Sequence, residues 1–495
     1  MSASNLLLEE FAKPRTPYLS TLLARGKNAS HLDLYWDTVV GADDQLRQRM
    51  GSALSQIIVV SDRGVNFFPK LAMAHYADIL HTHAFGNYRD LLKDITYSPA
   101  MSQYLTYMYN RKGNMETGSE PDENYAREFM QLFTIGLFEL NMDGSQRLDV
   151  EGNPIPTYGS DDVAGLSRVF TGLGFSGPNF YTSTADDDAF YKPIIMFPAQ
   201  HSERDKTFLG LTIPAGTDGD TSIDMAIDHI FDQPSVAPFI SRQLIQRFTM
   251  SHPTPDYVER VATAFETGRF VAPDGVTFGD GRKGDLQATL AAILLDPTQF
   301  DEAFAESESA GKIREPVLRF TQWARAFEAA PVLAENEQTL SDTNNPILRL
   351  GQQPLRAPSV FNFYRPGFIA PGTESGANDL TAPEFQIVND GTFYGYANFM
   401  TDFVIGRQLK ADLDVESFIP DYSTELALAD DAEALTNHLN MLLTGGRLDE
   451  VVSDRVIEIL NEIPILEASS DEDRLTRVHV AITLVITSPA YTFQR

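Results

Sequence analysis

Apolar residues recur at intervals of three and four along most of the chain, which is the spacing of one buried face of an α-helix. The first clear case is a helix that Asp43 and Asp44 can cap. Its apolar positions are Leu46, Met50, Leu54, Ile57 and Ile58. The same spacing predicts helices over residues 67–82, 87–95, 98–109, 122–133, 160–170, 222–231, 235–249, 255–265, 283–295, 315–327, 390–408, 430–444, 447–461 and 470–488.

Two long stretches lack this periodicity. Residues 137–215 are rich in Gly, Pro, Asp and aromatic residues, and Asp143-Gly144 within them is a hairpin signal. Residues 340–386 also read mainly as loop. Loops of this length in a compact protein are commonly functional or pack over a site. We therefore expect a mostly α fold: a large multi-helix globular unit with long loop insertions and a small β-hairpin element.

The alternation of helical and loop-rich stretches divides the chain into five parts, which we expect to form one compact unit. They are an N-terminal helical part (1–136), a loop-rich insertion with a small β element (137–221), a central helical part (222–330), a loop-rich segment (331–389) and a C-terminal helical part (390–495). A length of 495 residues alone would also fit two or three domains. No internal repeat or low-complexity tract separates the parts.

Composition excludes several classes of protein. Hydrophobic residues make up 43% of the chain, which excludes global disorder. A net charge of −31 disfavours nonspecific binding to nucleic acid. Acidic excess with few lysines suits a protein that stays soluble in salty surroundings. The absence of cysteine excludes disulfides, thiolate metal sites and cysteine nucleophiles. No apolar run reaches the length of a membrane span.

The helix predicted over residues 122–133 carries a polar stripe. At 100° per residue, one side of the helix presents Asn124, Arg127, Glu128 and Gln131. Such a group of directional hydrogen-bonding side chains suits a polar ligand or an acid–base site, with Glu128 as the acid–base residue. The alternative is a structural network, since Glu123 can pair with Arg127.

Histidines form a second set of candidates. His75, His81 and His83 are close in sequence, but on a helix the last two point in different directions, which favours capping and packing over a shared metal. His201 differs because it lies in a polar loop that also contains Lys206. A loop histidine beside charged groups can act as a general base or a metal ligand, or can simply lie on the surface.

The third candidate is the segment 356–367, where prolines bracket a run of aromatics. Its residues Asn362 and Tyr364 could contact a ligand, because aromatic faces suit stacking on a sugar ring. The alternative is a plug that seals the core. Signatures of zincin proteases, α/β-hydrolases, P-loop enzymes and dinucleotide-binding enzymes are absent from the sequence.

Several motifs together resemble the bacterial "domain of unknown function eighteen-hundred" family over about residues 40–400. They lie at 44–49, 53–56, 83–92, 122–128, 171–172, 201–210, 314–316 and 358–363. The motif at 83–92 adds His83 and Arg89 to the candidate ligand-binding residues. Members usually begin with a signal peptide and an early Thr-Phe-Gly motif, and residues 1–40 show neither.

The resemblance implies an exported protein, periplasmic or at the cell surface, of unsettled activity. It also implies a neighbouring gene whose product looks like a member of the alkaline phosphatase and sulfatase superfamily. The first hypothesis is an exported hydrolase-like enzyme acting on a carbohydrate-like or sulfated substrate. Arg127 would then orient an anionic group of the substrate, and Asn124 would hold its hydroxyls. His201 and Lys206 would complete the site from the loop.

Two alternatives stay open. One is a noncatalytic surface partner of the sulfatase-like protein. The other is a metal or haem oxidoreductase, in which His83, His201 and Glu128 would converge. No cofactor is predicted, although calcium near Asp218-Gly219-Asp220, or a transition metal, is a further alternative. No nucleic-acid partner is expected.

Overall fold

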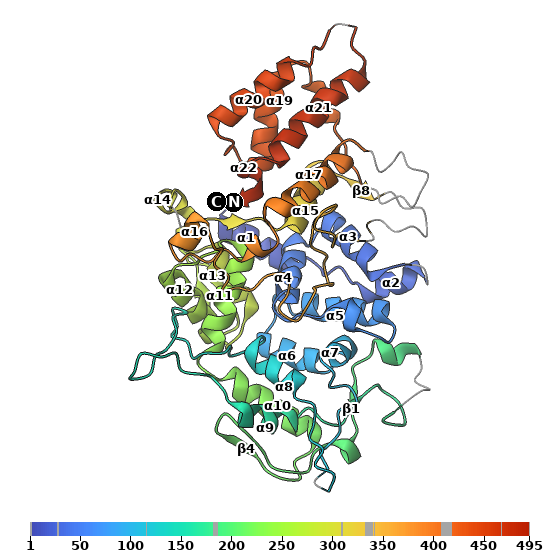
Figure 1. Ribbon diagram of the computed structural model, residues 1–495, viewed down its shortest axis with the longest axis vertical. Helices are drawn as coiled ribbons and strands as arrows, with labels where there is room; N and C mark the ends of the chain where they lie inside the picture. Colours follow the sequence, from blue (N-terminus) through green and yellow to red (C-terminus); the bar gives the residue numbers. More distant parts are fainter. Residues whose placement is uncertain are drawn as a thin grey trace.

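The computed structural model describes the whole chain except residues 1, 27–28, 115, 182–186, 308–309, 332–339, 341, 407–417, 467 and 495. The fold is mostly α, as the sequence predicts (Figure 1). The first half contains α1 (Ala3–Ala12), α2 (Leu19–Arg25), α3 (His31–Gly41), α4 (Gln45–Ser55), α5 (Pro69–Thr82), α6 (Tyr88–Thr96), α7 (Pro99–Tyr104), α8 (Asn124–Gln131), α9 (Ser160–Ser167), α10 (Gly219–Phe231) and α11 (Val236–Phe248).

The second half continues the helical pattern. It contains α12 (Pro255–Thr267), α13 (Leu286–Leu294), α14 (Glu302–Ala305), α15 (Pro316–Ala326), α16 (Glu374–Ala377), α17 (Asp390–Val404), α18 (Ser423–Ala427), α19 (Ala432–Leu439), α20 (Glu450–Asn461), α21 (Asp471–Ile486) and α22 (Pro489–Thr492). In Figure 1 the helices α19 to α21 lie at one end of the molecule, and α8 to α10 lie towards the other. None of the described helices is long and apolar enough to cross a bilayer.

The described strands pair in short antiparallel ladders. They are β1 (Leu173–Gly174) with β2 (Ile195–Met196), β3 (Lys206–Phe208) with β4 (Leu211–Ile213), β5 (Phe270–Val271) with β6 (Thr277–Phe278), β7 (Lys312–Ile313) with β10 (Phe493–Gln494), and β8 (Ala330–Pro331) with β9 (Phe418–Ile419). Residues 137–157 fold back on themselves through isolated bridges such as Leu140 to Gln146. We call this segment the arm; it projects from the side of the molecule in Figure 1.

One hydrophobic core joins the helical parts. Trp36 on α3 and Trp323 on α15 are both fully buried. Both pack against Phe320, with ring centroids 5.4 and 5.6 Å away. The Phe320 ring also contacts Phe399 and Phe403 on α17. The N-terminal, central and C-terminal helical parts therefore share apolar packing, which is the main source of stability in a fold of this kind.

Some boundaries differ from those the sequence predicts. The helix expected over 98–109 ends at Tyr104, and beyond it Thr106 and Tyr109 have positive φ, which a helix cannot accommodate. The helix expected over 430–444 changes at Asn440 into one π-helical turn. The helix expected over 390–408 ends at Val404, and the last two predicted residues lie outside the described residues. Helices α1 to α3 were not predicted.

Replacing Gly165 by alanine is expected to destabilise the protein by about 1–3 kcal/mol. Gly165 lies on α9, where an added Cβ would come 1.7 Å from the carbonyl oxygen of Thr207 on β3. The helix would have to move away from the β3–β4 ladder. The measurement is urea unfolding followed by circular dichroism. Gly41→Ala on α3 is the control, since an added Cβ there meets nothing within 4 Å and stability should not fall. Equal effects at both positions would contradict this prediction.

Candidate functional site

A cavity of about 710 Å³ lies between α11, the arm and the loop that follows α15. Its wall comes from segments far apart in sequence: the end of α4, the end of α8 with the start of the arm, one side of α11, and residues 360–367. The lining residues are Gln56, Ile57, Gln131, Leu132, Gly136, Leu137, Phe138, Leu140, Gly144, Ser145, Gln146, Phe239, Arg242, Gln243, Arg247, Val360, Phe361, Tyr364, Arg365, Pro366 and Gly367. The volume falls in the range of sites for small organic ligands.

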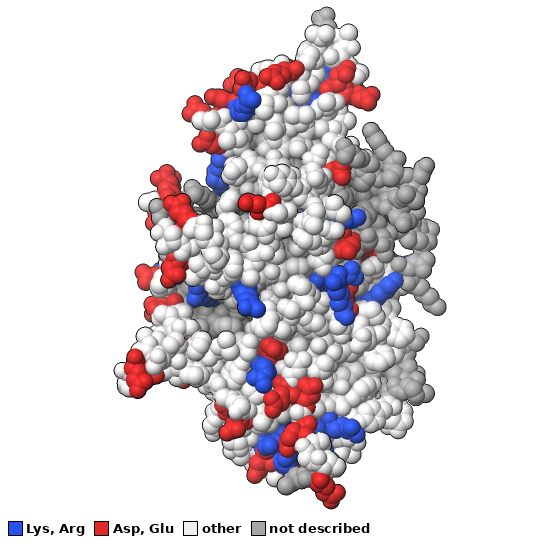
Figure 2. Space-filling view, in the orientation of Figure 1, with Lys and Arg blue, Asp and Glu red and all other residues white. Residues whose placement is uncertain are grey.

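The charge of this wall is opposite to that of the protein. The lining includes Arg242, Arg247 and Arg365, and no Asp, Glu or His is among the described residues that form it. The whole chain has 69 acidic residues and 38 basic ones. On the face shown in Figure 2, acidic side chains lie mostly at the two ends and along one edge. The cavity therefore holds positive charge that its own wall does not neutralise.

The helix α11 supplies the centre of this wall. Phe239, Arg242, Gln243 and Arg247 are spaced by three, one and four residues, so they share one side of the helix. The opposite side of α11 is apolar and packs in the core, where α11 contacts α12 and α13. The amphipathic pattern of the helix thus points arginine and glutamine side chains at the cavity.

Arg247 is the most unusual of these side chains. It is 1% exposed, and its Nε and Nη1 atoms have no hydrogen-bond partner among the described residues. Its Nη2 atom donates a long bond of 3.4 Å to the backbone oxygen of Gln56. The guanidinium lies 5.1 Å from the ring centroid of Tyr364. A buried guanidinium without full hydrogen bonding is costly, and because these two nitrogens are buried, Arg247 contributes positive charge to the wall rather than open hydrogen-bond donors.

The other two arginines have no carboxylate partner among the described residues. No hydrogen bond or ion pair joins the guanidinium of Arg242 to any residue that the structure describes, and burial lowers its pKa. The guanidinium of Arg365 stacks over the Phe361 ring at 4.9 Å. Elsewhere in this protein arginines pair with carboxylates, as Arg260 does with Asp296. Others, such as Arg319 and Arg477, donate to backbone oxygens. Arg242 and Arg365 are distinguished by their place in a cavity wall whose described residues include no carboxylate.

Gln56 connects the cavity to the core behind it. Its Oε1 atom accepts hydrogen bonds from the hydroxyl of Tyr364 (2.8 Å) and the amide of Asn362 (3.3 Å). Its Nε2 atom donates to Glu315 at 2.9 Å. Since every polar atom of the Gln56 amide is engaged, the orientation of the Tyr364 ring beside Arg247 is fixed.

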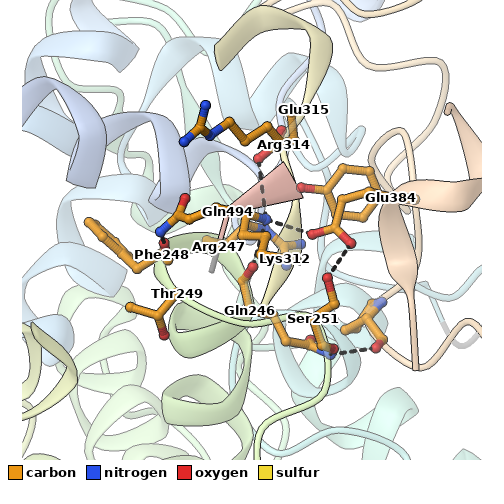
Figure 3. A network of polar contacts seen from close by, with 12 residues as sticks. Gln246, Arg247, Phe248, Thr249, Ser251, Lys312, Arg314, Glu315, Glu384 and Gln494 are labelled. Carbon is orange, nitrogen blue, oxygen red and sulfur yellow. Dashed lines mark hydrogen bonds and ion pairs between the residues drawn. The ribbon is translucent and has the colours of Figure 1, made fainter. Parts of the chain in front are cut away.

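Behind Gln56 lies a fully buried group of charges, which we call the ion cluster: Lys312, Glu315 and Glu384. Figure 3 shows the Lys312 ammonium between the two carboxylates and the backbone oxygen of Gln246. The distances from its Nζ atom are 2.5 Å to Glu384 and 3.9 Å to Glu315. Burial raises the pKa of Glu315, but the charges of Lys312, Arg49 and Arg247 and the hydrogen bond from Gln352 together outweigh it and hold that pKa below its usual value. The ion cluster is thus charged and sealed from solvent.

The sequence matches the family described as "Protein of unknown function (DUF1800)" over residues 21–493. The chain belongs to this family. The resemblance stated from the motifs is confirmed, and the match extends beyond the 40–400 range on which it was based. No curated protein and no solved structure matches the chain.

Three candidates from the sequence of this DUF1800 protein meet at the cavity. Tyr364 and Gln131 line it, and Asn362 bonds to the same Gln56 oxygen as Tyr364. Gln131 accepts a hydrogen bond from Tyr158 at 2.8 Å. The aromatic segment 356–367 therefore fits both interpretations of its sequence, a plug of the core and a ligand contact. Tyr364 is buried and still forms part of a cavity wall.

The rest of the α8 stripe is divided between surface and interior. Arg127 is exposed and pairs with Glu123 at 3.2 Å. Asn124 is also exposed and donates to Thr106 at 3.4 Å. Glu128 is buried, burial raises its pKa, and its Oε2 atom has no partner among the described residues. The stripe does not form one polar face, and Glu128 is not part of the cavity lining.

His201 and Lys206 form a separate buried pair in this DUF1800 fold. The Nδ1 atom of His201 donates to the backbone oxygen of Thr171 at 3.0 Å, which leaves Nε2 as a buried acceptor without a partner among the described residues. Burial lowers the pKa of His201, and the charge of Lys206 lowers it further. Lys206 is itself buried, and its Nζ atom donates to the backbone oxygen of Arg204. Neither residue lines the cavity.

The remaining candidates bind other side chains. His83 contacts Asp94 at 2.6 Å, and Arg89 pairs with Asp224 and Asp228. Asp218 of the calcium alternative caps α10, where its carboxylate accepts from the backbone N–H of Thr221. Among the described residues, no group of three His, Asp or Glu side chains could hold a metal ion.

The sequence reasoning missed Gln56, Phe239, Arg242, Gln243 and Arg247. A signal for three of them was present in this member of the family. The helix predicted over 235–249 is apolar except for a few polar side chains, and Arg242, Gln243 and Arg247 among these recur on one side at helical spacing. Two arginines on that side, with no acidic residue in the helix, mark a positively charged face.

Proposed function

We propose that this protein binds an anionic ligand in the cavity beside α11. The observation that supports the proposal most strongly is the set of three arginines, Arg242, Arg247 and Arg365, in a wall whose described residues include no Asp, Glu or His. A sulfate, phosphate or carboxylate group would supply the missing counter-charge, chiefly at Arg242 and Arg365, because the unpartnered nitrogens of Arg247 are themselves buried. Hydrogen bonds between ionised partners are short and about twice as strong as neutral ones, and a guanidinium offers them in pairs.

The rest of the wall suits such a ligand. Arg242 and Arg365 add positive charge, and no carboxylate of the described lining competes with the ligand. The amides of Gln131 and Gln243 and the edge of Tyr364 can hold polar substituents. A sulfated compound, the substrate class suggested by the resemblance, meets these requirements.

The geometry favours recognition over acid–base hydrolysis. Hydrolysis by carboxylate or histidine groups needs at least one such group within hydrogen-bond reach of the substrate. The described lining of the cavity contains neither, and Glu128 and His201 lie outside it. We therefore propose a binding role for this cavity, with the anion recognised and not cleaved.

The test is isothermal titration with para-nitrophenyl sulfate. We expect saturable binding that weakens as salt is added, and no release of nitrophenolate. The double variant Arg242→Gln/Arg365→Gln should bind at least about tenfold more weakly, because each charge-assisted contact contributes roughly 1.5–3 kcal/mol. The neutral para-nitrophenyl glucoside should bind far less well than the sulfate.

Arg455→Gln is the matched control, since Arg455 is an exposed arginine on α20 paired with Glu458. It should leave affinity unchanged. Equal affinity in the double variant and the unmodified chain would refute the proposed function. Nitrophenolate release that the double variant abolishes would refute recognition without cleavage.

A further inference from the structure

We infer that the ligand of the α11 cavity is amphiphilic: an anionic group carried by an apolar body. This inference rests on the proposed function and names the class of ligand more closely. The feature that supports it is the mixed wall formed by α11, which carries the apolar Phe239 at one end, Arg242 one turn further along and Arg247 at the other end. Eight residues separate Phe239 from Arg247, which places them about 12 Å apart along the helix axis.

The apolar end is covered by the arm. The backbone N–H of Leu140 donates to Ser235 at 3.0 Å, which holds the arm at the start of α11. Gly136 lies against the Phe239 ring so closely that an added Cβ would come within 2.9 Å of it. Leu137 and Phe138 follow directly and line the cavity. This half of the wall offers apolar contact surface at Leu137, Phe138 and Leu140, and its polar side chains are Arg242, Ser145 and Gln146.

The charged end is formed by the loop 360–367. The Tyr364 ring faces the Arg247 guanidinium, and the amide of Gln246 donates to the backbone oxygen of Pro366 at 2.9 Å. Gln56 fixes Tyr364 from behind. The two ends are thus built from different segments of the chain, each tied to its own end of α11.

Apolar side chains at this cavity remain in contact with solvent. Leu137 is 51% exposed and Phe361 is 39% exposed, and both line the wall. Exposed apolar surface that rims a concave site is stabilised when a ligand covers it. An inorganic anion or a fully hydroxylated sugar would leave this surface wet, whereas an alkyl or aryl chain would bury it. Medium-chain carboxylates and alkyl or aryl sulfates therefore fit both ends.

The test is calorimetric titration with butanoate, hexanoate and octanoate, and with octanamide as the neutral analogue. Each added methylene should lower Kd about threefold to fourfold, the value expected for burial of one methylene group. Octanamide should bind at least tenfold more weakly than octanoate, because it cannot pair with the arginines.

Two variants test whether the alkyl chain of the ligand lies against the apolar side chains of the cavity. Leu137→Ser and Phe239→Ala should reduce the gain per methylene while leaving butanoate affinity within about twofold. Leu137 is exposed, so its variant keeps the test valid even if Phe239→Ala does not fold. Phe393→Ala on α17 is the control, since Phe393 is 40% exposed and lies outside the cavity lining. Phe393→Ala should leave the gain in affinity per methylene unchanged.

The outcomes separate the two proposals. Butanoate binding that depends on Arg242 but does not strengthen with chain length would overturn the amphiphile and leave the anion site standing. A chain-length gain that both cavity variants leave intact would also overturn it. If no carboxylate of any length binds, and para-nitrophenyl sulfate does not bind, the proposed function itself fails.

Discussion

Replacing Lys312 by methionine is expected to lower the free energy of unfolding by about 3–5 kcal/mol. Lys312, Glu315 and Glu384 are all at most 1% exposed at their side chains. Removing the ammonium would leave two buried carboxylates without their shared counter-charge, and only Arg49 and Arg247 would still act on Glu315. Breaking a buried pair in this way costs far more than the intact pair contributes.

Hydrogen bonds can replace only part of what Lys312 supplies. Glu384 would still accept from the Ser251 hydroxyl at 2.9 Å. Glu315 would still accept from Gln352 at 2.6 Å and from Gln56. The backbone oxygen of Gln246 would lose its donor. Because Glu315 orients Gln56, and Gln56 orients Tyr364, we also expect weaker ligand binding at the cavity.

Urea unfolding at neutral pH measures the stability change. The double variant Lys312→Met/Glu384→Gln should recover a large part of the loss, since one stranded charge is removed together with its partner. Lys13→Met is the control, because Lys13 and Glu10 form a pair at the surface and such pairs contribute at most about 1 kcal/mol. A Lys312 variant no less stable than the Lys13 variant would show that the ion cluster is not charged as described.

Sequence periodicity predicted the fold well where one helical face is apolar and the ends carry caps. The helix expected over 255–265 is α12, which Pro255 begins and Gly268 ends in a left-handed conformation. Periodicity failed where tertiary contacts decide the backbone. The turn after α7 depends on Thr106 and Tyr109 in positive-φ conformations, which side-chain type does not encode.

The site was predictable only in part because its residues come together through packing. Tyr364 stood out as an aromatic in a proline-bounded loop, and Gln131 as part of a polar stripe. Nothing in the local sequence of Arg247 shows that it is 1% exposed or that Tyr364 lies beside it. Burial of a charge, and the absence of its partner, are properties of long-range contacts between segments more than 100 residues apart.

Acid should remove a stability contribution of up to about 3 kcal/mol from His81 as pH falls from about 6.5 to about 4. Burial lowers the pKa of His81 to about 4. Its Nδ1 atom donates to the backbone oxygen of Ala77 at 2.7 Å, and its Nε2 atom is buried against Gly51 without a partner among the described residues. A second proton would therefore have no acceptor.

The direction in which stability changes with pH follows from proton uptake by the folded and unfolded chains. The unfolded chain binds a proton at His81 near pH 6.5, and the folded chain does so only near pH 4, so the contribution is complete above about pH 6.5 and declines below it. Asp33 acts in the opposite direction, since burial first, and then the charge of Asp37, raise its pKa to about 6. In the unmodified protein these two effects therefore partly cancel.

Single variants resolve the two contributions. The stability difference between the unmodified chain and His81→Gln should shrink as pH falls from about 7 to about 4, by up to about 3 kcal/mol. The difference for Asp33→Asn should change with the opposite sign over the same window, because the folded state gains a proton at Asp33 that the unfolded state does not yet hold. Urea unfolding at a series of pH values measures both. A constant difference for His81→Gln would mean that the imidazole is protonated in the folded core, which its contacts with Ala77 and Gly51 do not accommodate.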